Sequence, residues 1–399
     1  MSQQPGLTRS LSLTMATACG LIAANIYYAQ PLIGLIAGSL GISTAHAGLI
    51  VTMCQAGYGL GLLFLVPLAD LAENRRLILG VLALGIASSV GVALSQSAGP
   101  FLFFCLALGL GSVSVQMLVP LTAHLASEEA RGREVGKVMS GLLLGIMLAR
   151  PAASLVTEIA GWRMVFVLSA LAMTAMGVAL WRRLPVHRPE RVTGYFGLLR
   201  SMAGLVRAHP VLRQRAVGQA MMFGSFSLFW TTTPLLLAGP DYGLSQAGIA
   251  LFAFAGVAGA VAAPLAGGWA DRGLGRGGAL AAMALAVIAY VLSHVGAPGS
   301  ALGLGMLVLA GIVLDFGVQA NLVFSQREIY GLAPRARGRL NGLFMATFFI
   351  GGAVGSGLGA FVFSHWGWGP TSALGLAAPA LAFVLRLRAR ETEAVPAAG

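Results

Sequence analysis

Long apolar runs separated by short polar connections make up most of the sequence. A helix needs about 20 mostly apolar residues to cross the hydrocarbon core of a bilayer, and twelve runs approach that length. The predicted spans are 12–37, 47–69, 77–95, 100–123, 136–157, 164–181, 214–238, 246–269, 278–295, 300–324, 340–362 and 370–386. The pattern therefore predicts an all-α membrane protein with twelve transmembrane helices.

The composition supports this prediction. Of the 399 residues, 57% are hydrophobic and only 10% are charged, whereas charged residues make up about 25% of an average soluble domain. The formal charge of +12 comes from short basic clusters between the apolar runs. Because these clusters form no continuous basic stripe, we expect the lipid bilayer to be the partner and expect no nucleic acid. The three cysteines all lie in apolar runs and predict no disulfide framework.

The basic residues also predict the orientation of the chain. All 25 Lys and Arg residues except Arg150 and Arg163 lie at the termini, in the segment 182–213, or in connections that follow even-numbered spans. Lys and Arg accumulate on the cytoplasmic side of membrane proteins. We therefore expect a multi-pass protein with both termini in the cytoplasm.

The segment 182–213 is the longest connection and separates two sets of six spans. We predict an N-terminal six-helix bundle at 1–181, a cytoplasmic linker at 182–213 and a C-terminal six-helix bundle at 214–399. Apolar residues recur at helical spacing between Tyr195 and Val206, which predicts an amphipathic helix on the inner leaflet. A solvated linker interrupted by prolines is the alternative.

The two sets of spans repeat each other. The sequence ARGR at 130–133 recurs at 336–339, and GW at 161–162 recurs at 367–368 with the same offset. Two parallel six-helix repeats are therefore expected. Glycine or alanine also stands at every fourth position within 141–153 and within 351–359. Small residues at this spacing let helices approach closely in a membrane, so both segments are expected to lie at helix contacts.

Two ionisable residues lie deep in predicted spans, Asp315 and Arg150. A carboxylate at the centre of a membrane helix costs about 2.5 to 3.5 kcal/mol, and such groups usually face a bundle interior or a water-filled cavity. We expect both residues to serve proton coupling or substrate contact. The alternative is a buried polar group that only holds helices together, and this alternative has more weight for Arg150. Counted from the predicted span ends, the two side chains differ in depth by several ångströms.

Two polar connections carry a resemblance to a known family. The sequences LADLAENRR at 68–76 and GGWADRGLGR at 267–276 resemble the loops that follow the second span of each half in the major facilitator superfamily. NIYYAQPL at 25–32, GIMLARPAASL at 145–155 and LDFGVQANLVFSQREIYGLAP at 314–334 resemble a bacterial branch related to drug:proton antiporters and sugar-efflux permeases. Two features depart from classical drug antiporters: the span 100–123 contains no arginine, and Arg150-Pro151 replaces a glycine-proline pair.

The resemblance implies the major facilitator fold and two groups of functional residues. In this family the acidic and basic residues of the paired loops form a latch at the cytoplasmic side. The expected gate residues are Asp70, Arg75, Arg76, Asp271, Arg272 and Arg276. The first and fourth spans of each half line the central cavity in the family. The expected cavity residues are Asn25, Tyr27, Tyr28, Gln30, Gln116, Gln219, Trp230, Gln319 and Asn321.

These observations lead to one functional prediction. We expect a secondary active transporter of the bacterial inner (plasma) membrane, a monomer that exports a small organic compound in exchange for protons by alternating access. Proton symport or facilitated uptake is the alternative, and a transporter-like membrane sensor is an alternative of another class. The sequence shows no nucleophile–base pair, no metal-ligand spacing among its six histidines and no phosphate-binding loop. We therefore expect no enzymatic activity, no metal and no cofactor.

Overall fold

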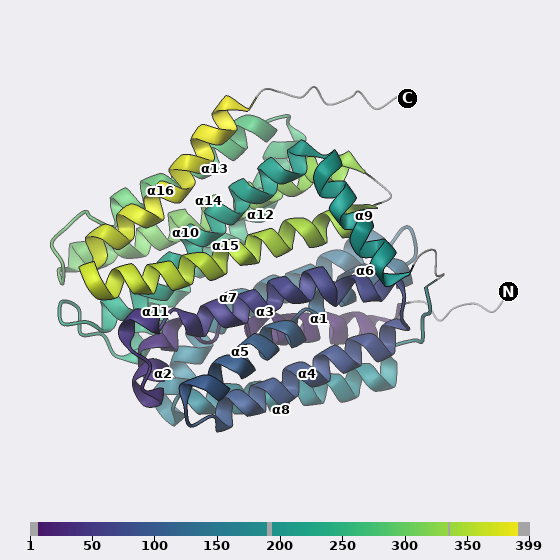
Figure 1. Ribbon diagram of the computed structural model, residues 1–399, viewed down its shortest axis with the longest axis horizontal. Coiled ribbons are helices and arrows are strands. Elements are labelled where there is room, and N and C mark those ends of the chain that lie inside the picture. Colours follow the sequence, from purple (N-terminus) through teal and green to yellow (C-terminus); the bar gives the residue numbers. More distant parts are fainter. Residues whose placement is uncertain (1–6, 190–193, 334–335, 390–399) are drawn as a thin grey trace.

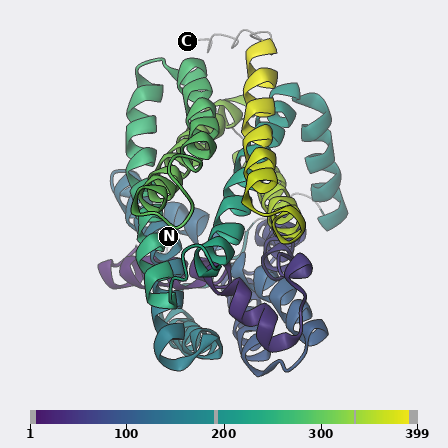
Figure 2. The same ribbon diagram turned by 90° about the vertical axis from the view of Figure 1, so that its left-hand side faces the viewer.

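Figure 1 shows the helices of the computed structural model arranged in two groups. The structure describes residues 7–189, 194–333 and 336–389. The N-terminal group holds α1 (Arg9–Ala24), α2 (Ile33–Leu40), α3 (Leu49–Phe64), α4 (Asn74–Leu94), α5 (Ala98–Ser112), α6 (Val115–Leu125), α7 (Arg131–Ala160) and α8 (Trp162–Arg183). The C-terminal group holds α10 (Pro210–Ala238), α11 (Gln246–Ala253), α12 (Gly259–Asp271), α13 (Gly275–Leu292), α14 (Ala301–Leu332), α15 (Arg337–Trp366) and α16 (Trp368–Arg388). In Figure 2 the two groups again lie one above the other.

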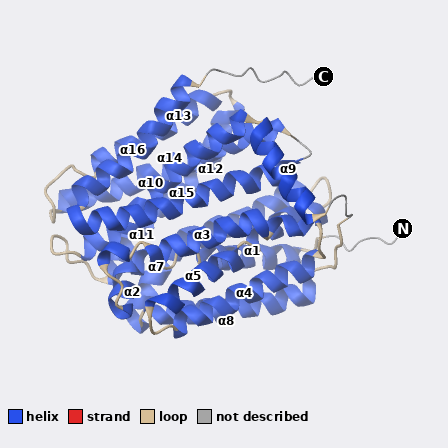
Figure 3. Ribbon diagram, in the orientation of Figure 1, coloured by secondary structure: helices blue, strands red, loops and turns tan. Residues whose placement is uncertain are grey.

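The prediction of an all-α membrane fold is confirmed. The described part of the chain is helical and contains no strand (Figure 3). Ten of its helical segments are long and apolar enough to cross a membrane. The remaining two predicted spans, 12–37 and 246–269, are each divided into shorter helices. Short 3₁₀ segments also occur, η1 (Gln30–Leu32), η2 (Thr44–His46), η3 (Val66–Asp70) and η4 (Phe254–Ala258).

The first of these breaks follows α1. The side-chain amide of Asn25 donates hydrogen bonds of 3.1 Å to the carbonyl oxygens of Leu21 and Ile22, so it satisfies acceptors that the end of the helix leaves free. Pro31 then lies in η1, where it supplies no backbone N–H. Irregular backbone at membrane depth is stable only inside the protein or beside a cavity, and Asn25 is buried here.

The expected contacts between small residues are confirmed in both groups. A Cβ atom at Gly20 on α1 would lie 2.6 Å from the carbonyl oxygen of Gly141 on α7. A Cβ atom at Gly224 on α10 would lie 2.9 Å from the carbonyl oxygen of Gly351 on α15. Real Cβ atoms do not fit at these distances, so glycine lets each helix pair approach closely. Glycines thus bring α1 close to α7 and α10 close to α15, and this equivalence between the groups reflects the sequence repeat.

Hydrogen bonds join the two groups toward one end of the helices. Thr52 on α3 donates to the carbonyl oxygen of Ala353 on α15 at 2.7 Å. The backbone N–H of Ala247, at the start of α11, donates to the carboxylate of Glu158 near the end of α7 at 3.1 Å. We call the opposite end, where α1 begins and α16 ends, the basic end, because the arginine-rich connections lie there.

The helix α9 (Tyr195–Ala208) contacts both groups at the basic end (Figure 1). The hydroxyl of Tyr195 donates to the carbonyl oxygen of Phe64 at the end of α3, at 2.9 Å. Arg339 at the start of α15 donates to the hydroxyl of Ser201 at 2.8 Å. Leu198 on the same helix is buried. The helix thus links the two groups, while its predicted position on the inner leaflet stays a prediction.

Candidate functional site

Arg150 and Asp315 come from different groups and lie at nearly the same depth. Arg150 lies 19 residues after Arg131, where α7 begins, and Asp315 lies 17 residues before Leu332, where α14 ends. At ~1.5 Å per residue, these positions differ by only ~3 Å along the two helices. The depth difference expected from sequence was too large, because both helices extend beyond the predicted spans.

Arg150 is held by one hydrogen bond and three aromatic rings. Its side chain is buried, with 3% of the residue exposed, and Nε donates to Oε1 of Gln30 at 2.8 Å. The guanidinium carbon lies 5.2, 5.0 and 4.3 Å from the ring centres of Tyr27, Phe226 and Trp230. A desolvated cation gains about 2 kcal/mol from such a ring. The rings therefore help to offset the cost of burying this charge.

Asp315 is also buried, with 4% of the residue exposed. Its Oδ1 accepts a hydrogen bond of 2.7 Å from the indole Nε1 of Trp230. A Cβ atom added to Gly256 in η4 would lie 2.9 Å from Oδ2 of Asp315 and 3.2 Å from Nη1 of Arg150. These two atoms are therefore at most about 6.1 Å apart, yet no direct ion pair joins the two described side chains. Trp230 contacts both charges and helps to hold them near each other.

Two donors in this site have no hydrogen-bond partner. Nη2 of Arg150 and Nε2 of Gln30 are both buried and unpaired. A buried donor without a partner loses about 1 to 3 kcal/mol of solvation, so an acceptor atom brought to either group would be bound favourably. A separation such as that between Arg150 and Asp315 is commonly bridged by one water molecule or one ligand oxygen.

The structure brings only some of the predicted cavity residues into this site. Tyr27, Gln30 and Trp230 surround Arg150 and Asp315, as described above. Asn25 instead accepts a hydrogen bond of 2.7 Å from Ser169 within the N-terminal group. The ring of Tyr28 packs edge-on against Phe166 at 6.5 Å between centres. Asn25 and Tyr28 therefore join α1 and the turn after it to α8.

The predicted residues of α14 and their neighbours have other contacts. Asn321 donates to Oε1 of Gln219 at 2.5 Å, and Gln219 donates to the carbonyl oxygen of Val318 at 3.2 Å. This chain of hydrogen bonds connects α10 and α14 inside the C-terminal group. Gln319 is half-buried and has no polar contact with the rest of the described chain.

A cavity of about 500 Å³ opens between the two groups at the basic end. Residues of both groups and of the connection 182–213 line it, among them Leu62, Asp70, Asn74, Gln116, His124, His187, Met202, Tyr330, Arg339 and Asn341. Gln116 donates to the hydroxyl of Tyr58 at 3.1 Å, whose ring lies 4.3 Å from that of Phe349 in the other group. The described structure thus has hydrogen bonds between the groups toward one end and a cavity between them at the other.

Two histidine rings are in contact at a tilted angle at the wall of this cavity. The ring centres of His124 and His187 are 4.2 Å apart. Burial lowers the pKa of His187, and the nearby His124 lowers it further. The neutral form of His187 is therefore favoured in the folded protein.

Among the described residues, the predicted gate residues of the N-terminal group form no hydrogen bond or ion pair with the other group, although Asp70 lies near Arg339 of α15. Asp70 is exposed at the end of η3, where it lines the cavity together with Arg339. Arg75 donates to the carbonyl oxygen of Trp181 on α8. Arg76 pairs with Glu73 at 3.2 Å.

The gate residues of the C-terminal group also make contacts within their own group. Asp271 pairs with Arg327 at the end of α14. Arg276 donates to the carbonyl oxygens of Leu387 and Ala389 at 3.1 and 3.2 Å. Arg272 is exposed. Among the described residues, the contacts given above for Arg75, Arg76, Asp271 and Arg276 each lie within one group.

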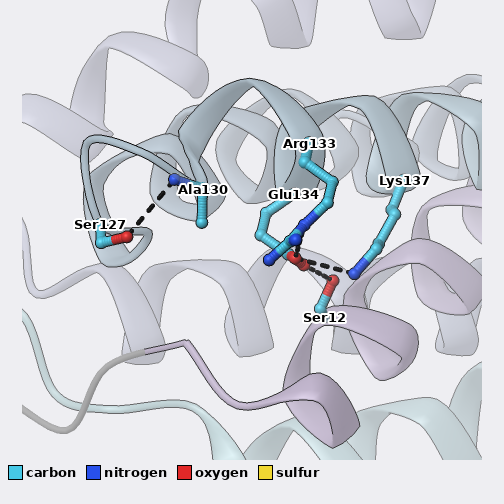
Figure 4. A network of polar contacts seen from close by, with 6 residues as sticks. All are labelled: Ser12, Ser127, Ala130, Arg133, Glu134 and Lys137. Carbon is cyan, nitrogen blue, oxygen red and sulfur yellow. Dashed lines mark hydrogen bonds and ion pairs between the residues drawn. The ribbon is translucent and has the colours of Figure 1, made fainter.

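A buried or half-buried glutamate with two cationic partners lies at the start of α7 and another near the end of α14, both at the basic end. Figure 4 shows Glu134 at the start of α7, where Lys137 donates at 2.7 Å, Ser12 of α1 at 2.6 Å and Arg133 at 3.3 Å. The same figure shows Ser127 accepting from the backbone of Ala130 just before that helix. In the C-terminal group, Arg215 of α10 and Arg386 of α16 each pair with Glu328 of α14 at 2.5 Å.

Some residues of the site were missed in the sequence. Gly256 and Phe226 lie in apolar runs with no distinguishing spacing, and Arg339 stands out in the sequence only as part of the repeated ARGR. The aromatic residues around Trp230, in the sequence FGSFSLFW at 223–230, were the available signal. In the described part of the chain, no three His, Cys, Asp or Glu side chains lie together in a way that could hold a metal ion.

Comparison with known proteins agrees with the fold and the membrane location. The family model "Major Facilitator Superfamily" matches residues 15–329 and 216–399. The "Uncharacterized transporter YgaY" of Escherichia coli O157:H7 is 41% identical over 362 residues, which is 91% of either chain. A "Chloramphenicol resistance protein" of Pseudomonas aeruginosa is 30% identical over 240 residues, 57% of this chain and 54% of that one.

A solved structure shows the same fold at low sequence identity. The crystal structure of the nucleoside transporter NupG superposes with a TM-score of 0.75 at 13% identity, and the match covers 95% of this chain and 98% of NupG. Together with the family match and the transporter relatives, this likeness identifies a bacterial multi-pass membrane transporter. The chain belongs to the major facilitator superfamily.

Proposed function

We propose that this transporter exports a small organic compound across the bacterial inner membrane in exchange for protons, with both termini in the cytoplasm. One observation carries the proposal: Arg150 and Asp315, from different groups and at the same depth, are buried close together without a direct ion pair. Transporters of this type move two repeats about a site near the middle of the membrane. A site built from both groups changes when the groups move.

Asp315 is the proposed proton-binding group. Arginine keeps its charge in proteins, so protonation of Asp315 changes the combined charge of the pair from zero to +1. The indole N–H of Trp230 stabilises the ionised carboxylate, and this hydrogen bond weakens when Asp315 takes up a proton. Proton binding and substrate binding at one site then affect each other through this charge.

The substrate is proposed to bind beside Arg150. The unpaired donors of Arg150 and Gln30 supply hydrogen bonds to acceptor oxygens, and the rings of Tyr27, Phe226 and Trp230 supply apolar walls. Small-molecule sites commonly combine aromatic walls with a few polar groups. The chloramphenicol resistance protein similar to this chain makes chloramphenicol a suitable first compound to test.

Access to the site is proposed to alternate between the two membrane faces. The cavity at the basic end is the cytoplasmic path, and the contacts between Thr52 and Ala353 and between Glu158 and Ala247 close the other face. The moving bodies are residues 1–181 and 214–399 of a monomer, joined by the linker 182–213. In the opposite conformation, Asp70 and the other gate residues are proposed to close the cavity.

The test measures chloramphenicol uptake into everted membrane vesicles with an imposed proton gradient, acid inside. We expect gradient-driven uptake by the wild-type protein and none by Asp315→Asn. Exchange of labelled for unlabelled chloramphenicol without a gradient should persist in Asp315→Asn, because exchange needs no net proton movement. The matched control is Asp241→Asn, an exposed acid in the connection between α10 and α11, which should behave as wild type.

Two outcomes would contradict the proposal. Gradient-driven uptake that survives in Asp315→Asn would remove Asp315 from coupling and leave it a structural role. Uptake into everted vesicles that requires the opposite gradient would indicate proton symport and import. A panel of small aromatic compounds is tested in the same way if chloramphenicol is not transported by the wild type.

A further inference from the structure

A second cavity, separate from the proposed transport site, lies at the basic end of the C-terminal group. It has a volume of about 420 Å³ and is bounded by α10, α13, α14 and α16, which are labelled in the upper part of Figure 1. Four arginines line it, Arg213, Arg215, Arg386 and Arg388.

The positive charge of this cavity exceeds the negative charge around it. Among the described residues, Glu328 is the only acid that pairs with any of the four arginines, and it contacts Arg215 and Arg386. One carboxylate balances one arginine, so three positive charges stay uncompensated. Arg213 donates through Nη1 to the carbonyl oxygens of Val206 and Arg207 at 2.7 and 2.9 Å, which orients this side chain without neutralising it.

Arg386 provides an independent indication that this cavity suits a ligand with acceptor oxygens. Its side chain is only 5% exposed, and its Nε is buried without a hydrogen-bond partner although the residue lines the cavity. Buried charged groups normally use their hydrogen-bonding capacity fully. An arginine fork with spare donors matches the oxygens of a phosphate group.

The apolar part of the cavity wall indicates which kind of molecule carries the phosphate. Val217 and Leu385 line the cavity, and both are exposed on the outside of the helix group, where lipid chains run in a membrane protein. A phosphate bound among the arginines would therefore continue into an apolar surface. Basic pockets between membrane helices on the cytoplasmic side are suited to anionic lipid headgroups.

We propose that this arginine cavity binds the phosphate of an anionic phospholipid in the cytoplasmic leaflet, with the acyl chains lying along Val217 and Leu385. The bound lipid would hold the starts or ends of α10, α14 and α16 together at the basic end. This site rests on the proposed orientation of the chain, but it does not involve Arg150 or Asp315 and so does not depend on the proposed transport cycle.

The test measures lipid binding to the full-length protein. The purified chain in neutral detergent is titrated with phosphatidylglycerol, with phosphatidylcholine and with inorganic phosphate, and bound lipid is counted by native mass spectrometry. The double variant Arg213→Gln with Arg388→Gln removes two charges and leaves the contacts of Glu328 intact. Each surface arginine changes such binding by about fivefold, so the double variant should weaken phosphatidylglycerol binding roughly 25-fold.

The sequence repeat supplies a matched control. Arg182 at the end of α8 occupies the position equivalent to Arg388, and it is also exposed. The variant Arg182→Gln should bind phosphatidylglycerol as the wild type does. A double variant that binds like the wild type would overturn the proposal, as would equal binding of phosphatidylcholine. Displacement of the lipid by inorganic phosphate at similar concentrations would assign the site to a soluble phosphate instead.

Discussion

The charges at the centre of the molecule differ from those at its basic end. At the basic end, Glu134 and Glu328 each contact two cations directly (Figure 4 for Glu134). At the centre, Arg150 and Asp315 lie close together without a direct ion pair, and Trp230 contacts both side chains. Direct pairs hold helices in one arrangement. Charges kept apart retain the capacity to bind a proton or a ligand.

The two basic-end clusters also differ from each other. Glu134 uses cations one and three residues away on its own helix, whereas Glu328 uses arginines from α10 and α16. The position equivalent to Glu134 in the repeat is Leu340, which is buried against Leu212 and Phe344. One repeat therefore joins its first and fifth spans with a hydrogen bond from Ser12, and the other joins the equivalent helices with apolar contacts.

The largest effect is expected when one central charge is removed. Arg150→Met leaves Asp315 buried without a nearby cation, which should cost about 3 kcal/mol of stability. The double variant Arg150→Met with Asp315→Asn should recover most of this loss, because neither charge is then left alone. Thermal unfolding of the purified variants in detergent measures both. A double variant no more stable than Arg150→Met would show that the two charges do not interact.

A smaller effect is expected at the paired glutamates. Glu328→Gln should cost about 2 kcal/mol, because it leaves the buried Arg386, with its side chain 5% exposed, without its acid. Glu134→Gln should cost about 0.5 kcal/mol, since Arg133 is 72% exposed and stays solvated. The same unfolding measurement compares them. Equal losses would contradict the distinction between the two clusters.

Gly256 offers a way to disturb the central site without removing a charge. Gly256→Ala places a methyl group against Asp315 and Arg150 and should destabilise the protein by about 1 kcal/mol, with a larger proportional loss of transport. The control Gly80→Ala, on α4, adds a methyl group where no atom lies within 4 Å. Transport and stability that fall equally in Gly256→Ala would argue against a specific role for this contact.

The smallest effect concerns pH at the basic end. The pKa of His187 is lowered by burial and by His124, so the unfolded chain binds this proton more readily than the folded protein. The stability that neutral His187 provides is therefore present above the ordinary pKa of about 6.5 and is lost as the pH falls through that value and below it. In His187→Gln, the melting temperature should fall slightly less steeply as the pH is lowered. An unchanged or steeper decrease would contradict this assignment.

Much of the fold could be predicted from the sequence, because apolar residues concentrate in membrane-spanning segments and basic residues concentrate in the connections on one side of the membrane. The glycine positions also predicted that 141–153 and 351–359 lie at close helix contacts, as Gly141 shows, but they did not predict Gly20 as its partner. The breaks after α1 and at η4 could not be predicted, because hydropathy is the same for a continuous and an interrupted apolar segment. Pro31 and Gly256 were the local signals that those breaks offered.

The site was harder to predict than the fold. Asn25 and Gln30 lie five residues apart, yet one bonds within the N-terminal group and the other contacts Arg150. Which way each side chain points depends on distant helices and on the irregular backbone between the two residues. Asp315 and Arg150 stood out because charge in an apolar run is costly. Their similar depth could not be predicted, because α7 and α14 extend beyond the apolar runs and the composition does not show where they end.

The central claim is that Asp315 takes up and releases a proton because no cation is paired with it directly. Infrared difference spectra recorded while the pH is lowered detect the C=O band of a protonated carboxyl group in the full-length protein in lipid. We expect a band in the wild type and in Asp241→Asn that Asp315→Asn lacks. Identical spectra for the wild type and Asp315→Asn would contradict it.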